Sequence, residues 1–196
     1  MVPENAMNAP GRETGDMRDT VWFFAYGSLM WNPGFEHDAV VEATLHGHHR
    51  ALCIYSWVWR GTREKPGLVL GLAEGGSCRA QAIGVRRERE AEVLAILDAR
   101  ELVTGVYHRK HLPLELADGG TIEAWCYLAR SDHEQFAGDL EAVDALRLIR
   151  QGHGRGGDNS EYVLNTAEHL RILGIRDERL ELLTMHLAAD RNARIR

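Results

Sequence analysis

Long apolar runs, clusters of basic residues and closely spaced cysteines are all missing from this chain of 196 residues. No stretch approaches the roughly 18 consecutive apolar residues that a membrane helix needs. Lysine and arginine form no long run and the formal net charge is -6, so we expect no nucleic-acid partner and no membrane partner. The three cysteines are far apart and lack Cys-x-x-Cys spacing, which is typical of reduced thiols in a cytoplasmic protein.

Several catalytic motifs are missing as well. Ser28 lies in Tyr-Gly-Ser-Leu, which lacks the second glycine of a Gly-x-Ser-x-Gly nucleophile elbow. The glycine-rich stretch 152–157 lacks the Gly-Lys-Ser/Thr ending of a phosphate-binding loop. His46, His48 and His49 are close in sequence, but no further ligands stand at the spacing of a zinc site. Surface histidines on a strand are therefore favoured over a metal site.

The composition is that of a single globular domain, with 44% hydrophobic and 27% charged residues. Residues 1–19 are polar and lack the apolar centre of a secretory signal, so they are predicted to be a disordered tail. The domain is predicted to span residues 20–187. The arginine-rich residues 188–196 are predicted to be a frayed C-terminal tail.

Periodicity divides the domain into short strands followed by helices. Strands separated by glycine and proline favour a mostly antiparallel barrel or a strongly bent sheet. Gly47 is interpreted as a turn or bulge, and Gly75-Gly76 as a break. The expected strands are 21–24, 39–45, 48–55, 68–73 and 78–86, with a hairpin formed by 108–116 and 121–128. The expected helices are 88–101, 132–151, 158–174 and 177–187.

The stretch from Phe23 to Trp31 runs from an apolar strand directly into a turn. Gly27 permits backbone conformations that other residues resist, and Ser28 adds a small hydroxyl. Backbone N–H groups that converge in such a turn can hold an anion or a polarised carbonyl. By spacing alone, a tight strand exit beside the core is the simpler interpretation.

Glu101 is the carboxylate of greatest interest. It ends a predicted helix and precedes apolar Leu102 and Val103. An apolar environment disfavours the charged form and raises the pKa of a carboxyl group, which suits it to proton transfer. The alternative is a solvated glutamate at a helix end, paired with Arg100 or another cation.

Trp57, Trp59 and Arg60 form an aromatic and cationic cluster between two predicted strands. Such residues line ligand pockets, but they also form packed loops. Both interpretations stay open at this level.

Taken together, these segments resemble the ChaC-type γ-glutamylcyclotransferases, which act on glutathione. The resemblance covers about residues 20–185 in family order, and Ala25 stands where the family often has glycine. The segments are Tyr26-Gly27-Ser28-Leu29-Met30-Trp31, Arg60-Gly61-Thr62, Pro66-Gly67-Leu68-Val69-Leu70-Gly71-Leu72, Gly75-Gly76-Ser77-Cys78, Arg100-Glu101-Leu102-Val103-Thr104-Gly105-Val106-Tyr107, Asn159-Ser160-Glu161-Tyr162-Val163-Leu164 and Leu173-Gly174-Ile175-Arg176-Asp177.

The resemblance implies an α+β fold, a small mixed or antiparallel barrel with flanking helices. It implies release of 5-oxoproline and cysteinylglycine from glutathione, without a cofactor or metal. Glu101 is then the catalytic base and acid. Substrate contacts are expected from Ala25, Tyr26, Gly27, Ser28, Leu29 and Met30, and also from Arg60, Tyr107 and Tyr162.

In that reaction the α-amino group of the substrate is the nucleophile, so no serine or cysteine nucleophile is required. Other γ-glutamyl amines or amino acids are an alternative substrate class, and a catalytically silent γ-glutamyl-binding module is a second alternative. Acyl transfer through Ser28 or Cys53 is the least favoured. We expect the protein to act as a monomer in the cytoplasm.

Overall fold

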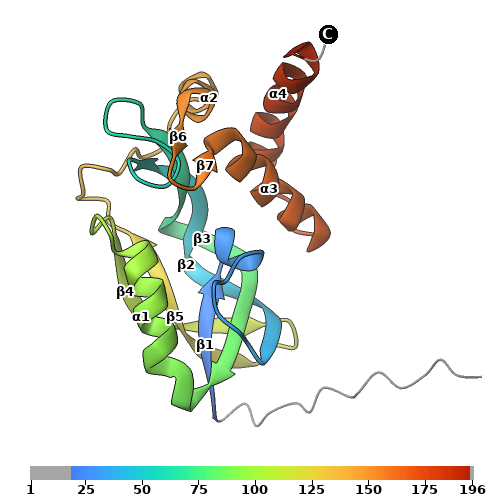
Figure 1. Ribbon diagram of the computed structural model, residues 1–196. Coiled ribbons are helices and arrows are strands. Elements are labelled where there is room, and N and C mark those ends of the chain that lie inside the picture. Colours follow the sequence, from blue (N-terminus) through green and yellow to red (C-terminus); the bar gives the residue numbers. More distant parts are fainter. Residues whose placement is uncertain (1–18, 195–196) are drawn as a thin grey trace, which may run out of the picture.

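A five-stranded barrel forms the centre of the protein (Figure 1). The computed structural model describes residues 19–194. The strands follow the order β1-β3-β2-β4-β5, and parallel pairing of Trp22 with Ala124 joins β1 to β5 and closes the barrel. The expected barrel is therefore confirmed. The strands are β1 Thr20–Ala25, β2 Ala39–Ser56, β3 Gly67–Arg86, β4 Tyr107–Leu116 and β5 Thr121–Ala129.

β2 and β3 each continue through a point where the sequence suggested an interruption. His46 pairs with Ser77 and His48 with Glu74, so Gly47 faces the two residues Gly75 and Gly76. Such a β-bulge bends a strand pair without ending it. The three glycines have φ of 82°, 93° and 67°, a region that other residues rarely adopt. The bulge interpretation of Gly47 is confirmed, whereas the break at Gly75-Gly76 is wrong.

The helices follow the predicted order, and the major difference is that residues 132–141 do not join the helix predicted there. α1 begins directly after a short 3-10 helix, and α4 continues beyond its expected end at 187. No helix within residues 19–194 is long and apolar enough to cross a membrane. The helices are η2 Ser28–Met30, η3 Arg87–Arg89, α1 Glu90–Glu101, α2 Ala142–Gln151, α3 Asn159–Ile172 and α4 Glu178–Arg194, and a hairpin of β6 His153–Gly154 and β7 Gly157–Asp158 links α2 to α3. Residues 1–18 of the tail expected at residues 1–19 lie outside the described residues.

The first half of the predicted helix 132–151 is not helical. There the backbone pairs with β2: the Tyr55 N–H donates to the Gln135 carbonyl at 2.8 Å, and the Ala137 N–H donates to the Cys53 carbonyl at 2.7 Å. A backbone group that serves this pairing is not free for a helical bond. Only the amphipathic half of the segment forms α2.

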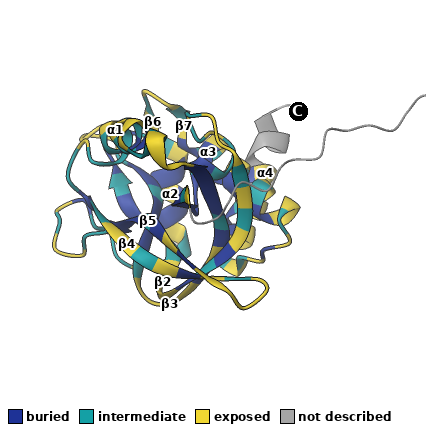
Figure 2. Ribbon diagram, turned by 90° about the horizontal axis from the view of Figure 1, so that it is seen from below, coloured by how far each residue is buried: buried dark blue, intermediate teal, exposed yellow. Residues whose placement is uncertain are grey.

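Alternate residues of β1 face two apolar clusters, as the period of a strand requires. Phe24 belongs to a cluster that extends from the barrel to α2, α3 and α4, while Phe23 packs with Leu97 of α1. In Figure 1, α2, α3 and α4 gather at one end of the barrel and α1 lies along its side. In Figure 2 the buried residues are concentrated in the strands of the barrel. The end of β1 therefore lies where α1, α3 and the barrel meet.

Candidate active site

A cavity of about 420 Å³ opens at the end of β1. Its wall combines the turn after β1, the loop after β2, the end of α1 and the side of α3. Expected site residues that line it are Tyr26, Gly27, Ser28, Leu29, Arg60, Glu101, Tyr107 and Tyr162. Ala25 and Met30 do not line this cavity. Ala25 is fully buried in the core, and Met30 packs against the same core cluster.

The turn after β1 is a single 3-10 helical turn. The Met30 N–H donates to the Gly27 carbonyl at 2.9 Å, so this donor is already occupied. The first N–H groups of a helical turn have no partner inside it, which leaves those of Ser28 and Leu29 for an anion. Gly27 has φ of -136°, so the turn does not use the left-handed backbone region open to glycine.

Glu101 lies at the last position of α1 and is mostly buried, with 19% of its side chain exposed. Burial raises its pKa, and Arg100 opposes this effect through an ion pair of 3.3 Å. The predicted rise of the Glu101 pKa is therefore confirmed in direction, but its cause is burial in the folded chain, since Val103 itself is exposed. The ion pair considered as the alternative is present at the same time.

Arg100 is a site residue that the sequence analysis did not select. Its guanidinium donates to the Ser28 hydroxyl and to the Asn32 carbonyl, the latter at 2.7 Å, while it pairs with Glu101. It therefore connects the end of α1 to the turn after β1. Its position beside Glu101 was visible in the sequence, but its contacts to Ser28 and Asn32 depend on the folded chain.

A second set of contacts fixes the end of α1 from the opposite side. Asp98 lies one helical turn before Glu101, where the two side chains share a face. Its carboxylate accepts a hydrogen bond of 2.7 Å from the Tyr127 hydroxyl and pairs with Arg109. Both partners belong to the barrel wall, so Asp98 holds the helix end that carries Glu101.

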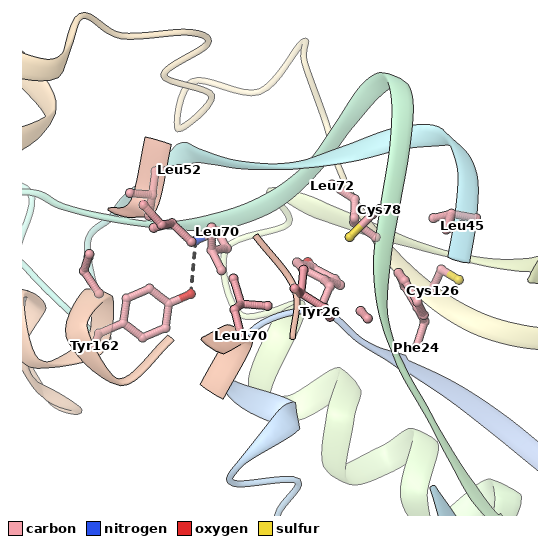
Figure 3. Packing of buried hydrophobic residues seen from close by; sticks show 14 of the residues in the cluster. Phe24, Tyr26, Leu45, Leu52, Leu70, Leu72, Cys78, Cys126, Tyr162 and Leu170 are labelled. Atoms are coloured by element: carbon pink, nitrogen blue, oxygen red, sulfur yellow. Dashed lines mark hydrogen bonds between the residues drawn. The ribbon is translucent and has the colours of Figure 1, made fainter. Parts of the chain in front are cut away.

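Side chains cover the edge of β3 that faces the cavity. The buried Asn159 side chain accepts from the Leu68 N–H at 2.6 Å and donates to the Leu68 carbonyl at 2.7 Å. The Leu70 N–H donates to the Tyr162 hydroxyl at 3.1 Å, and the Tyr107 hydroxyl donates to the Leu70 carbonyl at 2.6 Å. Figure 3 shows the Tyr162 hydroxyl directed at Leu70. These bonds fix two tyrosines in the cavity wall.

Three phenols lie close enough to Glu101 for its charge to act on them. Burial, and secondarily Glu101, raises the pKa of Tyr26 well above its usual value. Burial likewise raises the pKa of Tyr107, and it raises that of Tyr162 to about 12. All three hydroxyls are therefore neutral near neutral pH and retain their protons as donors. Because the Tyr162 oxygen accepts from Leu70, its own proton is left for another acceptor.

Glycines allow the loop after β2 to pack closely against the hairpin of β6 and β7. The Gly156 N–H donates to the Trp59 carbonyl at 2.8 Å. A Cβ atom on Gly154 would lie 2.6 Å from the Val58 carbonyl oxygen, too close for any other residue. The loop holds Arg60 with its guanidinium 5.4 Å from the Tyr162 ring centre. Trp57, Trp59 and Arg60 all line the cavity, and a ligand-binding role for this cluster stays a prediction.

The remaining nucleophile and ligand candidates lie elsewhere or are buried. The three cysteines are free and buried, and burial raises the pKa of Cys53 to about 12. His46 bonds to Glu115 on the surface, and His49 to the Gly75 carbonyl. Within residues 19–194, no group of three histidine, cysteine or acidic side chains is arranged to hold a metal ion.

Comparisons with known proteins identify the family of this chain. Residues 21–190 match the family model described as ChaC-like protein. The glutathione-specific gamma-glutamylcyclotransferase of Escherichia coli K12 is 36% identical over 82% of this chain and 69% of its own length. The human glutathione-specific gamma-glutamylcyclotransferase 1 is 29% identical over 86% of this chain and 78% of its own.

Solved structures show the same fold. A yeast gamma-glutamyl cyclotransferase specific to glutathione superposes with a TM-score of 0.77, covering 87% of this chain and 96% of the yeast chain at 20% identity. At that identity the likeness describes the fold, whereas the family model and the bacterial relative carry the assignment. Because the family model matches residues 21–190 and the bacterial relative is 36% identical over 82% of this chain, the chain belongs to the ChaC-like family.

Proposed function

We propose that the protein is a γ-glutamylcyclotransferase that cleaves glutathione into 5-oxoproline and cysteinylglycine. The observation that carries this proposal is a buried carboxylate, Glu101, in one cavity with the turn Tyr26–Leu29 and three neutral tyrosines. The curated relatives from Escherichia coli and human act on glutathione by name, and the family is shared.

The reaction needs a folded substrate more than a protein nucleophile. The α-amino group attacks the γ-carbonyl carbon of the same molecule, a C–N bond closes the five-membered ring, and the C–N bond to cysteine breaks. Holding the two groups in attack geometry is worth on the order of 7–11 kcal/mol. The small cavity between the turn after β1, α1 and Tyr162 suits that task.

Glu101 moves the proton in this scheme. Its carboxylate takes a proton from the α-ammonium group, and the resulting carboxylic acid then gives a proton to the departing amine of cysteine. Burial raises the Glu101 pKa, which brings proton uptake and release closer to neutral pH. Arg100 limits the rise, because its charge favours the carboxylate form.

Neutral donors serve the charges that the substrate brings and develops. Ser28, Leu29 and Tyr162 line the cavity, and in this proposal the two backbone N–H groups and the Tyr162 hydroxyl hold the substrate carboxylate or the developing oxyanion. Arg60, beside the Tyr162 ring, supplies a positive charge at the same wall. Tyr107 and Tyr26 donate to protein carbonyls and hold the wall in place.

The experiment is product analysis with purified protein. Glutathione should yield equal amounts of 5-oxoproline and cysteinylglycine. The α-linked isomer of glutathione and N-acetylglutathione should release no cysteinylglycine, because the amine of the first cannot close a five-membered ring on the carbonyl bonded to cysteine and the second lacks a free amine. A parallel series of γ-glutamyl amino acids and amines tests the alternative substrate class. Absence of both products from glutathione at high protein concentration would refute the proposal.

We propose that the protein acts as a monomer, which light scattering coupled to size exclusion can test. Three free, buried thiols agree with the cytoplasmic location that we propose. Fractionation of the native cells tests it.

A further inference from the structure

Arg50 is a buried cation that lies outside the catalytic cavity. Only 6% of its side chain is exposed, and burial of an unpaired charge is costly. Its guanidinium donates from Nε to the Tyr26 carbonyl at 2.7 Å and from Nη2 to the Arg79 carbonyl at 2.9 Å. The nearest carboxylate in the described chain is Asp177, at 4.0 Å from Nη1. The closest and best-formed of these contacts is therefore the one to Tyr26.

The Tyr26 carbonyl belongs to the peptide group that also contains the Gly27 N–H. No peptide bond in residues 19–194 is cis, and in a planar trans peptide the C=O and N–H point in opposite directions. Arg50 lines a separate cavity of about 590 Å³, whereas Gly27 lines the catalytic one. A carbonyl held on the Arg50 side therefore turns the Gly27 N–H to the opposite side, where the substrate would lie.

A charged donor also changes the strength of this peptide group. Hydrogen bonds from a guanidinium are stronger than neutral ones, and linked hydrogen bonds polarise one another. A carbonyl that accepts from Arg50 makes the N–H of the same peptide a better donor. The low exposure of Arg50 limits screening of this effect by water.

We propose that Arg50 is a positioning residue, which fixes and polarises the Tyr26–Gly27 peptide so that the Gly27 N–H donates to the carboxylate or the developing oxyanion of the γ-glutamyl substrate. This inference rests on the proposed function, since it assigns a donor to that substrate. Arg50 itself does not touch the substrate.

The first test compares two arginine-to-methionine variants, Arg50→Met and Arg79→Met. Arg79 is an exposed arginine on β3 that pairs with Glu42, so its variant controls for the loss of one arginine. We expect Arg50→Met to lower kcat/KM for glutathione about 100-fold, as misplacement of a substrate-orienting group does. Arg79→Met should keep the wild-type value. Wild-type kcat/KM in a folded Arg50→Met protein would overturn the inference.

The second test follows the Gly27 amide by NMR and also covers a variant that fails to fold. On titration of the wild-type protein with 5-oxoproline, the Gly27 amide proton should move downfield, and the Arg50 Nε proton should respond. In folded Arg50→Met the Gly27 shift should be lost, whereas a purely structural role would leave it unchanged. A Gly27 amide that stays still while other cavity residues shift would overturn the inference. A wild-type protein that forms no 5-oxoproline from glutathione would instead refute the proposed function.

Discussion

The two halves of β3 show how one strand serves structure at one end and chemistry at the other. Residues Gln81–Gly84 pair with β1 on one edge and with β2 on the other. In residues 67–72 the described strand partner is β2 alone, and side chains cover the other edge. In residues 81–84 the backbone groups on both edges are used for hydrogen bonds to other strands. In residues 67–72 one edge bonds to side chains instead, and these side chains include residues of the cavity wall.

The register shift between β2 and β3 contributes to this difference. Ala51 pairs with Gly71 and Ile54 with Val69, so one extra residue of β2 faces the β3 backbone around Leu70. Leu70 is the residue whose N–H and carbonyl bond to Tyr162 and Tyr107. Bulges often occur next to active sites because they redirect side chains and local backbone groups. Catalytic activity should therefore depend on residues 67–72 of β3 more than on the other half of this strand.

The largest effect should come from Glu101→Gln. This variant lacks the proposed proton-transferring group beside residues 67–72 of β3. It should lower turnover of glutathione about 1,000-fold, within the range for general acid–base catalysis. Glu42→Gln is the matched control, because Glu42 pairs in register with Gln81 in the doubly paired half. Its variant should keep wild-type turnover. Equal losses in the two variants would break the comparison.

Asn159→Ala should cause the next largest effect, on stability. It leaves the buried N–H and carbonyl of Leu68 without partners, at a cost of about 3 kcal/mol in the free energy of unfolding. Urea denaturation measures this loss. Asn165→Ala is the control on the same helix, because Asn165 is exposed. If both variants unfold alike, the side-chain cover of β3 is not a stabilising feature.

Two glycines test how tightly each half of β3 is packed. A Cβ on Gly67 would meet the Arg60 carbonyl oxygen of the backbone, whereas on Gly84 it would meet side-chain atoms of Thr20 and Trp22 at 2.8 Å. Side chains yield more easily than backbone, so Gly67→Ala should destabilise by about 3 kcal/mol and Gly84→Ala by about 1 kcal/mol. Thermal unfolding gives the order, and a reversed order would contradict the stated packing.

The smallest effect is a pair of opposite pH dependences. Burial raises the pKa of Glu101, so its contribution to stability is present below the unfolded pKa and is lost as pH rises through the folded pKa. Glu101→Gln should therefore exceed the wild type in Tm more at about pH 8 than at about pH 4.

Glu42 should behave in the opposite way. Its hydrogen bond from Arg79 lowers its pKa, so its contribution is present above the unfolded pKa and is lost as pH falls through the folded pKa. Glu42→Gln should lie below the wild type in Tm at neutral pH and approach it in acid. The same sign for both variants would remove the electrostatic part of the comparison.

Local pattern was sufficient for the elements whose stability is local. The strand that becomes β1, the hairpin of β4 and β5, and α1 all follow from periodicity and turn residues. The prediction of a helix at residues 132–141 was wrong because the backbone of this segment pairs with β2, which is distant in sequence. The prediction of a break at Gly75-Gly76 was wrong because these glycines form a bulge, and the pairing of β2 with β3 continues past it.

The candidate site divides in the same way. The direction of the Glu101 pKa shift agrees with the prediction, but the burial that causes it comes from the folded chain, because the neighbouring Val103 is exposed. Asn159 and Leu68 are 91 positions apart, and Arg50 reaches Tyr26 across 24 positions, so no local pattern indicates either contact. Arg100 was visible beside Glu101, but its bond to Ser28 spans 72 positions.

The sequence by itself determined the short strands followed by helices, the resemblance to the ChaC-type enzymes that implied the barrel, the buried thiols and the direction of the Glu101 pKa shift. These depend on composition, period and residues adjacent in the chain. Only the tertiary structure decided which edge of β3 has no strand partner and which tyrosines form hydrogen bonds to that edge. It also decided how Arg50 and Arg100 hold the turn after β1. Those features depend on hydrogen bonds between groups that folding alone brings within 3 Å or so of each other.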